Sequence, residues 1–259
     1  MEKRVLAHLQ LGNVASEKTL VFLHGSTMTK ELMVPFMEKF LDYNCISLDL
    51  PAHGQSACAL PEDVTGYAEA VEETILHLQN EGIATKDVVL MGYSLGGAIV
   101  SDVAIRKNVA LSGIVFLSSC ANMDQYTPLV DGLKDMPKEE FKTAAIIDFL
   151  YGPDTPQEVK DVMSESFIKL GAPDEVGYND LIVANKYNRI EELKGLEVPA
   201  MIIHGNDDRI ILPMAAVDLW NALPNSELLM LPYRGHSAIF DDTDAVATKI
   251  QSFIKRAVA

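Results

Sequence analysis

The chain has 259 residues, and 48% of them are hydrophobic, which is enough apolar material for a sizeable core and excludes disorder as the default. Its formal net charge is -16, from 37 acidic and 21 basic residues. Nucleic acids and anionic membrane surfaces bind to basic patches, so this balance argues against both of them as partners and favours a small-molecule substrate.

The cysteine and histidine residues give no sign of a disulfide framework or a metal site. The three cysteines, Cys45, Cys58 and Cys120, are odd in number, and none belongs to a C-x-x-C or Cys/His cluster. No two histidines have the spacing of metal ligands, so we expect neither a metal nor another cofactor. The start of the chain has no long apolar run typical of a signal peptide or membrane span, which predicts a cytoplasmic protein.

The first half of the chain alternates predicted strands with predicted helices. An alternating segment over residues 5–11 indicates an edge strand, and continuous apolar runs indicate buried strands. Those runs cover residues 19–23, 45–50, 88–91 and 111–117, and helical spacing covers residues 32–40, 64–78 and about 95–106. This order predicts an α/β fold with a parallel sheet, whose sites lie at the carboxyl edge of the strands.

The alternation stops between residues 122 and 196, where helical patterns appear over 138–151, 156–170 and 175–187. Strands are again predicted over 198–203 and 226–231, with helices over 213–223 and 246–258. We therefore expect a core formed by residues 1–121 and 197–259, with a helical cap, residues 122–196, inserted in it. The methionines and aromatic residues of this insertion either fill the seam with the core or line a substrate cavity under a lid.

Ser94 lies in the segment Gly92-Tyr93-Ser94-Leu95-Gly96, between an apolar strand and a helix rich in small residues. This is the G-x-S-x-G pattern, in which a tight turn projects a serine hydroxyl toward a base. Glycine at positions 92 and 96 removes Cβ atoms that would clash there. The alternative is a strand, turn and helix in which the serine has no catalytic role.

Two further polar groups follow strand ends later in the chain. Asp207 and Asp208 come after the strand at 198–203, and His236 comes after the strand at 226–231. The order serine, acid, histidine belongs to one of several unrelated triad folds. Because adjacent side chains diverge, only one of the two aspartates can point at the imidazole.

Five segments, each following a predicted strand, together resemble the α/β-hydrolase family over nearly the whole chain. They are His24-Gly25, Asp49-Leu50-Pro51-Ala52-His53-Gly54-Gln55-Ser56, Gly92-Tyr93-Ser94-Leu95-Gly96-Gly97, His204-Gly205-Asn206-Asp207-Asp208 and Gly235-His236. The resemblance implies a mostly parallel, eight-stranded sheet flanked by helices, with a helical cap inserted after the sixth strand. The family has glycine where this chain has Ala52, so the turn there is expected to differ slightly.

The resemblance also implies roles for particular residues. Ser94 is the expected nucleophile, His236 the general base and then acid, and Asp208 the expected acid partner, preferred over Asp207. A less common acid position in the family corresponds to Asp124. The backbone N–H groups of Leu95 and Ser26 are the expected oxyanion donors.

These features predict a carboxylesterase-like serine hydrolase that acts on small to medium uncharged esters through an acyl-enzyme. A second hypothesis is hydrolysis of a carbon–carbon bond in a diketone-like compound. Ser26 faintly resembles relatives with that activity, but their glycine-rich continuation is replaced by Thr27-Met28-Thr29. A third is a non-catalytic ligand receptor on the same fold. His24 and His204 are interpreted as buried core groups or as groups that support the site residues, and His53 as part of a structural turn.

Overall fold

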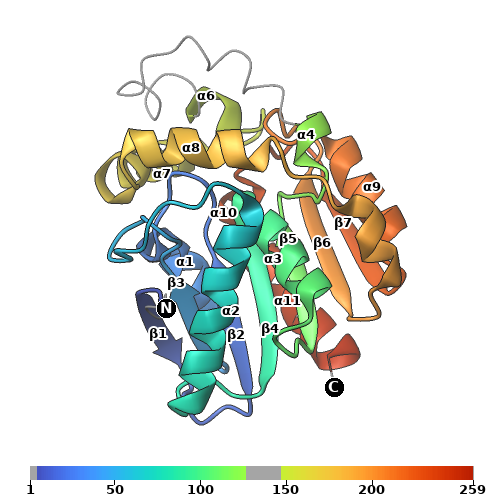
Figure 1. Cartoon of the computed structure of the whole chain (residues 1–259). Coiled ribbons are helices and arrows are strands. Elements are labelled where there is room, and N and C mark those ends of the chain that lie inside the picture. The colour runs from blue at the N-terminus through green and yellow to red at the C-terminus, as the bar shows by residue number, and fades with distance from the viewer. Residues whose placement is uncertain (1–4, 127–146, 259) are drawn as a thin grey trace.

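The computed structural model describes residues 5–126 and 147–258 of the chain. Within these residues one sheet has the strand order β1-β3-β2-β4-β5-β6-β7, with β1 antiparallel to β3 and every other pair parallel (Figure 1). The strands are β1 (His8–Gly12), β2 (Lys18–Leu23), β3 (Asn44–Leu48), β4 (Asp87–Tyr93), β5 (Gly113–Leu117), β6 (Ala200–Gly205) and β7 (Ser226–Leu231). The α/β-hydrolase fold expected from the sequence is confirmed.

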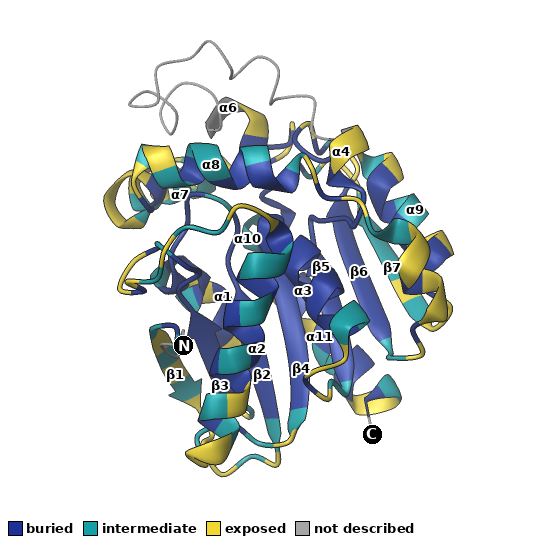
Figure 2. Ribbon diagram, in the orientation of Figure 1, coloured by how far each residue is buried: buried dark blue, intermediate teal, exposed yellow. Residues whose placement is uncertain are grey.

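The described residues form seven strands, one fewer than the eight that the family resemblance implied. The residues themselves contain seven strand patterns, and each of these became a strand. The eighth strand was expected from the resemblance alone, and no apolar or alternating run in the sequence corresponds to it. The edge prediction for the first segment holds, because β1 alternates between exposed and half-buried positions while β3, β5 and β6 are buried throughout (Figure 2).

Helices cover both faces of the sheet. On one face lie α2 (Val64–Asn80), α3 (Leu95–Arg106) and α9 (Pro213–Ala222), and on the other lie α1 (Val34–Met37) and α11 (Thr243–Ala257) (Figure 1). Short 3-10 turns, η1 (Lys30–Met33) and η2 (Glu38–Phe40), flank α1, and α10 (Ala238–Asp241) precedes α11. Figure 2 shows the buried side of these helices turned to the sheet, which places the apolar core in two layers around the strands.

The described part of the segment between β5 and β6 lies across the carboxyl ends of the strands (Figure 1). Its described helices are α4 (Met123–Tyr126), α6 (Ile147–Leu150), α7 (Gln157–Leu170), α8 (Asp174–Ala184) and the 3-10 helix η5 (Ile190–Gly195). The predicted helices over 156–170 and 175–187 correspond to α7 and α8. Most of the predicted helix over 138–151 falls outside the described residues.

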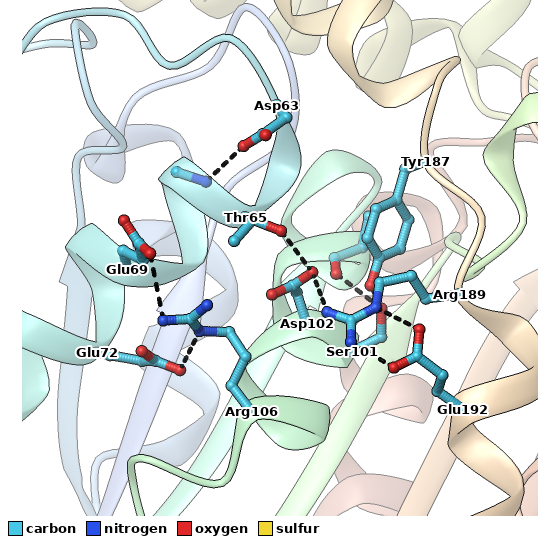
Figure 3. A network of polar contacts seen from close by, with 12 residues as sticks. Asp63, Thr65, Glu69, Glu72, Ser101, Asp102, Arg106, Tyr187, Arg189 and Glu192 are labelled. Atoms are coloured by element: carbon cyan, nitrogen blue, oxygen red, sulfur yellow. Dashed lines mark hydrogen bonds and ion pairs between the residues drawn. The ribbon is translucent and has the colours of Figure 1, made fainter.

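Residues near the start and near the end of this segment lie side by side. Asn122 and Asn188 form an antiparallel bridge, and the Arg189 N–H donates to the Ala121 carbonyl at 2.8 Å. The Arg189 side chain donates to buried Asp102 of α3 at 2.9 Å (Figure 3). Next to this pair, the Tyr187 hydroxyl lies 2.7 Å from the Ser101 hydroxyl. These contacts fix the return of the chain to the helix that follows Ser94.

Left-handed backbone conformations gather at the carboxyl edge of the sheet. Non-glycine residues with positive φ follow the ends of five parallel strands, at Thr27, Ala52, Ser94, Ser118 and Tyr233. Ala52, where the family has glycine, has a φ of 64°, so this chain keeps a glycine-like turn without glycine. In the described residues, no helix combines the length and the apolar character needed to cross a bilayer.

Candidate active site

Ser94 is held in a strained turn between β4 and α3, with φ of 53° and ψ of -119°. Glycine is required on both sides of it. A Cβ at Gly92 would lie 2.1 Å from the carbonyl oxygen of Gly96, and a Cβ at Gly96 would lie 2.5 Å from the carbonyl oxygen of Leu23. The Ser119 hydroxyl donates to the Ser94 carbonyl at 2.6 Å and braces the turn from the neighbouring strand end. The local pattern therefore forms the projecting turn that the sequence predicts.

Among the three candidate carboxylates, Asp208 is the one that contacts the imidazole of His236. Its Oδ2 lies 2.7 Å from His236 Nδ1, and both side chains are buried. Asp207 is only half-buried, and its backbone N–H donates to Arg234. Asp124 is exposed and accepts a hydrogen bond from Asn188 at 3.0 Å. Of these three carboxylates, only Asp208 therefore lies where the expected acid partner of His236 would be.

Asp208 is held in its charged form. Burial alone would raise the pKa of Asp208, but the adjacent His236 and His204 outweigh burial and hold this pKa well below its usual range. The other carboxylate oxygen, Oδ1, accepts the N–H groups of Ile210 and Ile211 at 2.9 and 3.0 Å. A charged acceptor at Nδ1 keeps a proton on that nitrogen of His236, which leaves Nε2 free to accept one.

Ser94 and His236 line the same cavity, together with Ser26. The cavity volume is about 30 Å³, room for about one water molecule and far below the roughly 300–1,000 Å³ of typical ligand pockets. Its other lining residues are Tyr93, Leu150, Phe167, Leu181 and Ile210. None of the described lining residues is a lysine, arginine, aspartate or glutamate. The groups predicted to react therefore meet in a small, mainly apolar space.

The two residues whose backbone N–H groups are the expected oxyanion donors, Leu95 and Ser26, both lie next to Ser94. Leu95 is the first residue of α3, and the first N–H groups of a helix have no acceptor within it. The loop after β2 passes directly beside the serine, because a Cβ on Gly25 would lie 3.0 Å from the Ser94 Cβ. Ser26, the next residue, has a buried hydroxyl without a hydrogen-bond partner among the described residues.

His24 fills the structural role expected of it. The Leu50 N–H donates to its Nε2 at 3.0 Å, and its Nδ1 lies 2.8 Å from the Gly25 carbonyl. Burial, and then the neighbouring His53, lower the pKa of His24 well below its usual value, so the ring is neutral. It ties the ends of β2 and β3 together.

In the described residues no group of three histidine, cysteine, aspartate or glutamate side chains is arranged to hold a metal ion.

Two polar residues near the site make contacts that the sequence reasoning did not specify. His204, interpreted as a buried core group or as one that supports the site residues, has its Nε2 3.2 Å from Asp208 Oδ2. Asp180 of α8 was not singled out at all, although it is fully buried and contacts His53 at 2.9 Å. The one signal for Asp180 was a charge directly before the apolar run Leu181-Ile182-Val183.

Comparisons with known proteins identify the family of the chain. The model of a family described as the alpha/beta hydrolase family matches residues 20–249. The chain is 25% identical to AB hydrolase superfamily protein YisY of Bacillus subtilis (strain 168), with 93% of each chain covered. It is 24% identical to Lipase 1 of Psychrobacter immobilis, covering 96% of this chain and 80% of that one. Among solved structures, a lipase-esterase related protein from Clostridium acetobutylicum ATCC 824 has a TM-score of 0.81 and 28% identity, covering 96% of this chain and 100% of that one.

Proposed function

The chain belongs to the alpha/beta hydrolase family, and from this premise we propose that it is a serine hydrolase of small to medium uncharged carboxylic esters. The observation that carries the proposal is the placement of His236. Its Nδ1 lies 2.7 Å from buried Asp208, and its ring lines the cavity that also receives Ser94. This arrangement lies at the carboxyl edge of the sheet, where open α/β folds carry their sites, and it supports Ser94 as nucleophile, His236 as base and Asp208 as acid partner.

The proposed reaction proceeds through an acyl-enzyme. The Ser94 oxygen attacks the ester carbonyl while His236 Nε2 takes the serine proton. The N–H groups of Leu95 and Ser26 stabilise the oxyanion of the tetrahedral intermediate. The intermediate collapses as His236 returns the proton to the leaving alcohol, and water then attacks the acyl-enzyme by the same steps. Asp208 remains ionised and stabilises the imidazolium that forms.

The cavity supports an uncharged substrate. Its described lining offers aliphatic and aromatic side chains and no lysine or arginine to bind a carboxylate or phosphate. Phe167 of α7 and Leu181 of α8 belong to the inserted segment and line one side of the cavity. We propose that residues 122–196 act as a cap, because a volume of about 30 Å³ holds no ester until such side chains move. Lipase 1 and the lipase-esterase related protein are relatives whose names fit ester substrates.

A fluorophosphonate probe tests the proposal directly. Wild-type protein should be labelled covalently and should hydrolyse p-nitrophenyl esters of short to medium acyl chains. Ser94→Ala should lose both the labelling and the turnover. Equal labelling of the two proteins, or no labelling of the wild type, would count against the proposal.

Hydrolysis of a carbon–carbon bond is the second candidate, favoured by one observation. The buried Ser26 hydroxyl has no hydrogen-bond partner within the described part of the chain, lies at the edge of the cavity and can donate to a second carbonyl of a diketone. Turnover of a coloured dienoate without activity on p-nitrophenyl esters would reverse the ranking. Tight ligand binding without any turnover would instead support a receptor.

A further inference from the structure

Asp180 of α8 is fully buried and joins three separate elements of the core. Its Oδ1 accepts the Tyr67 hydroxyl of α2 at 2.6 Å. Its Oδ2 lies 2.9 Å from His53 Nε2 and accepts the backbone N–H of Thr27 at 3.4 Å. His53 Nδ1 lies 2.9 Å from the Pro51 carbonyl, so both ring nitrogens face acceptors and both need a proton. Removing a charged carboxylate from water costs free energy, so we expect Asp180 to have a role besides packing.

Thr27 belongs to the oxyanion loop, by which we mean residues 25–29. Two further hydrogen bonds join this loop to the turn between α7 and α8. The Ala172 N–H donates to the Thr27 carbonyl at 2.8 Å, and the Thr29 hydroxyl donates to the Leu170 carbonyl at 2.8 Å. Thr27 itself has a φ of 65°, a conformation that needs support from its surroundings. Both sides of the Thr27 backbone are therefore held by the segment between β5 and β6.

We propose that Asp180 is a positioning residue for the oxyanion loop, and this inference rests on the proposed function. The N–H of Thr27 is part of the peptide that links it to Ser26. Fixing that peptide through the carboxylate fixes the backbone rotation at Ser26, and with it the direction of the neighbouring donor N–H. The inserted segment thus contributes to transition-state stabilisation through one side chain, besides shaping the cavity.

Two substitutions separate positioning from simple anchoring. Asp180→Ala removes the acceptor of the Thr27 N–H, whereas Tyr67→Phe removes a hydrogen bond from the same carboxylate and leaves the Thr27 contact in place. Arg189→Gln provides a second control, because it breaks an ion pair between the returning segment and α3 far along the chain from the oxyanion loop (Figure 3). Thermal denaturation of all three variants measures how much each loses in stability.

The expected result is a change in kcat rather than in KM. Misplacing a donor by about 1 Å costs up to roughly 100-fold, so Asp180→Ala should lower kcat for a p-nitrophenyl ester by about 10- to 100-fold. KM should change by less than about threefold, because the oxyanion forms only in the transition state. Tyr67→Phe and Arg189→Gln should keep kcat within about threefold of the wild type. Asp180→Asn, which keeps an oxygen acceptor, should fall between the wild type and Asp180→Ala.

Hydrogen exchange supplies a readout that needs no substrate. The amide protection of residues 25–29 should fall in Asp180→Ala and stay unchanged in Tyr67→Phe. Equal losses of kcat in these two variants, a loss confined to KM, or unchanged exchange in the loop would overturn the proposal. If wild-type protein neither labels with a fluorophosphonate nor hydrolyses esters, the proposed function fails, and the exchange result alone decides whether Asp180 holds the loop.

Discussion

Substituting Asp208 by asparagine tests the proposed triad with little change in shape. In the native protein, Oδ1 accepts the N–H groups of Ile210 and Ile211, and Oδ2 faces His236. An asparagine has one oxygen, and the two backbone donors require it. Its NH₂ group then points at His236 Nδ1, which must become an acceptor and pass its proton to Nε2.

The consequence is a histidine in the wrong tautomer. With a proton on Nε2, His236 cannot accept the proton of Ser94, and no carboxylate stabilises the imidazolium. Loss of the acid in such triads typically lowers kcat by about 10⁴, which corresponds to about 5.5 kcal/mol of transition-state stabilisation. Binding of the ester is unaffected by the tautomer, so KM should stay within a few-fold of the wild type.

Steady-state hydrolysis of a p-nitrophenyl ester measures this effect, with Asp207→Asn as the matched control. Asp207 is adjacent in sequence and half-buried, so its substitution should leave kcat nearly unchanged. Activity of Asp208→Asn within about tenfold of the wild type would refute the role of Asp208. A comparable loss in Asp207→Asn would refute the choice between the two.

Three more predictions concern the cavity, a buried pair and a turn. Phe167→Ala should raise kcat/KM for medium relative to short acyl chains by roughly tenfold, while Ile168→Ala, at a position that is 53% exposed, should leave the chain-length profile unchanged. Burial would lower the pKa of His53, but Asp180 outweighs burial and raises it. The stabilisation from this pair is therefore complete below about pH 6.5 and is lost as pH rises through the raised folded-state pKa, so thermal melts should show a decline that His53→Gln lacks. Ala52→Gly should relieve up to about 1 kcal/mol of strain and raise Tm by about 2–4 °C, and an unchanged Tm would show that the φ of 64° costs nothing.

The sequence predicted most of the sheet and the residues that meet at its edge. Strand runs and glycine positions are local signals, and Ser94, Asp208 and His236 each lie in the turn or loop that follows a strand. Parallel strands bring their carboxyl ends to one edge, so local order was sufficient to place these three groups together. Only the strand count, which came from the family resemblance, was off by one.

Contacts between distant parts of the chain left no local pattern. Asp180 lies 127 residues from His53 and 153 residues from Thr27 in sequence, and its burial depends on how α8 settles on the loops after β2 and β3. A lone aspartate before an apolar run is compatible with a solvent-facing helix position. His204 likewise gave no sign that its ring would contact Asp208, because His204 lies near the end of β6 and the path of the loop that carries Asp208 is set by packing.

The bridge between Asn122 and Asn188 brings the two ends of the inserted segment together. Because the two ends of the inserted segment meet at this hydrogen-bonded bridge, we expect that a different segment can be grafted between these two asparagines while the sheet stays intact. Such a graft would alter which esters enter. It would also need a carboxylate in the place of Asp180 to contact His53 and Thr27. We expect a grafted segment chosen only for its fit to a new substrate to give an enzyme that folds well but turns over slowly.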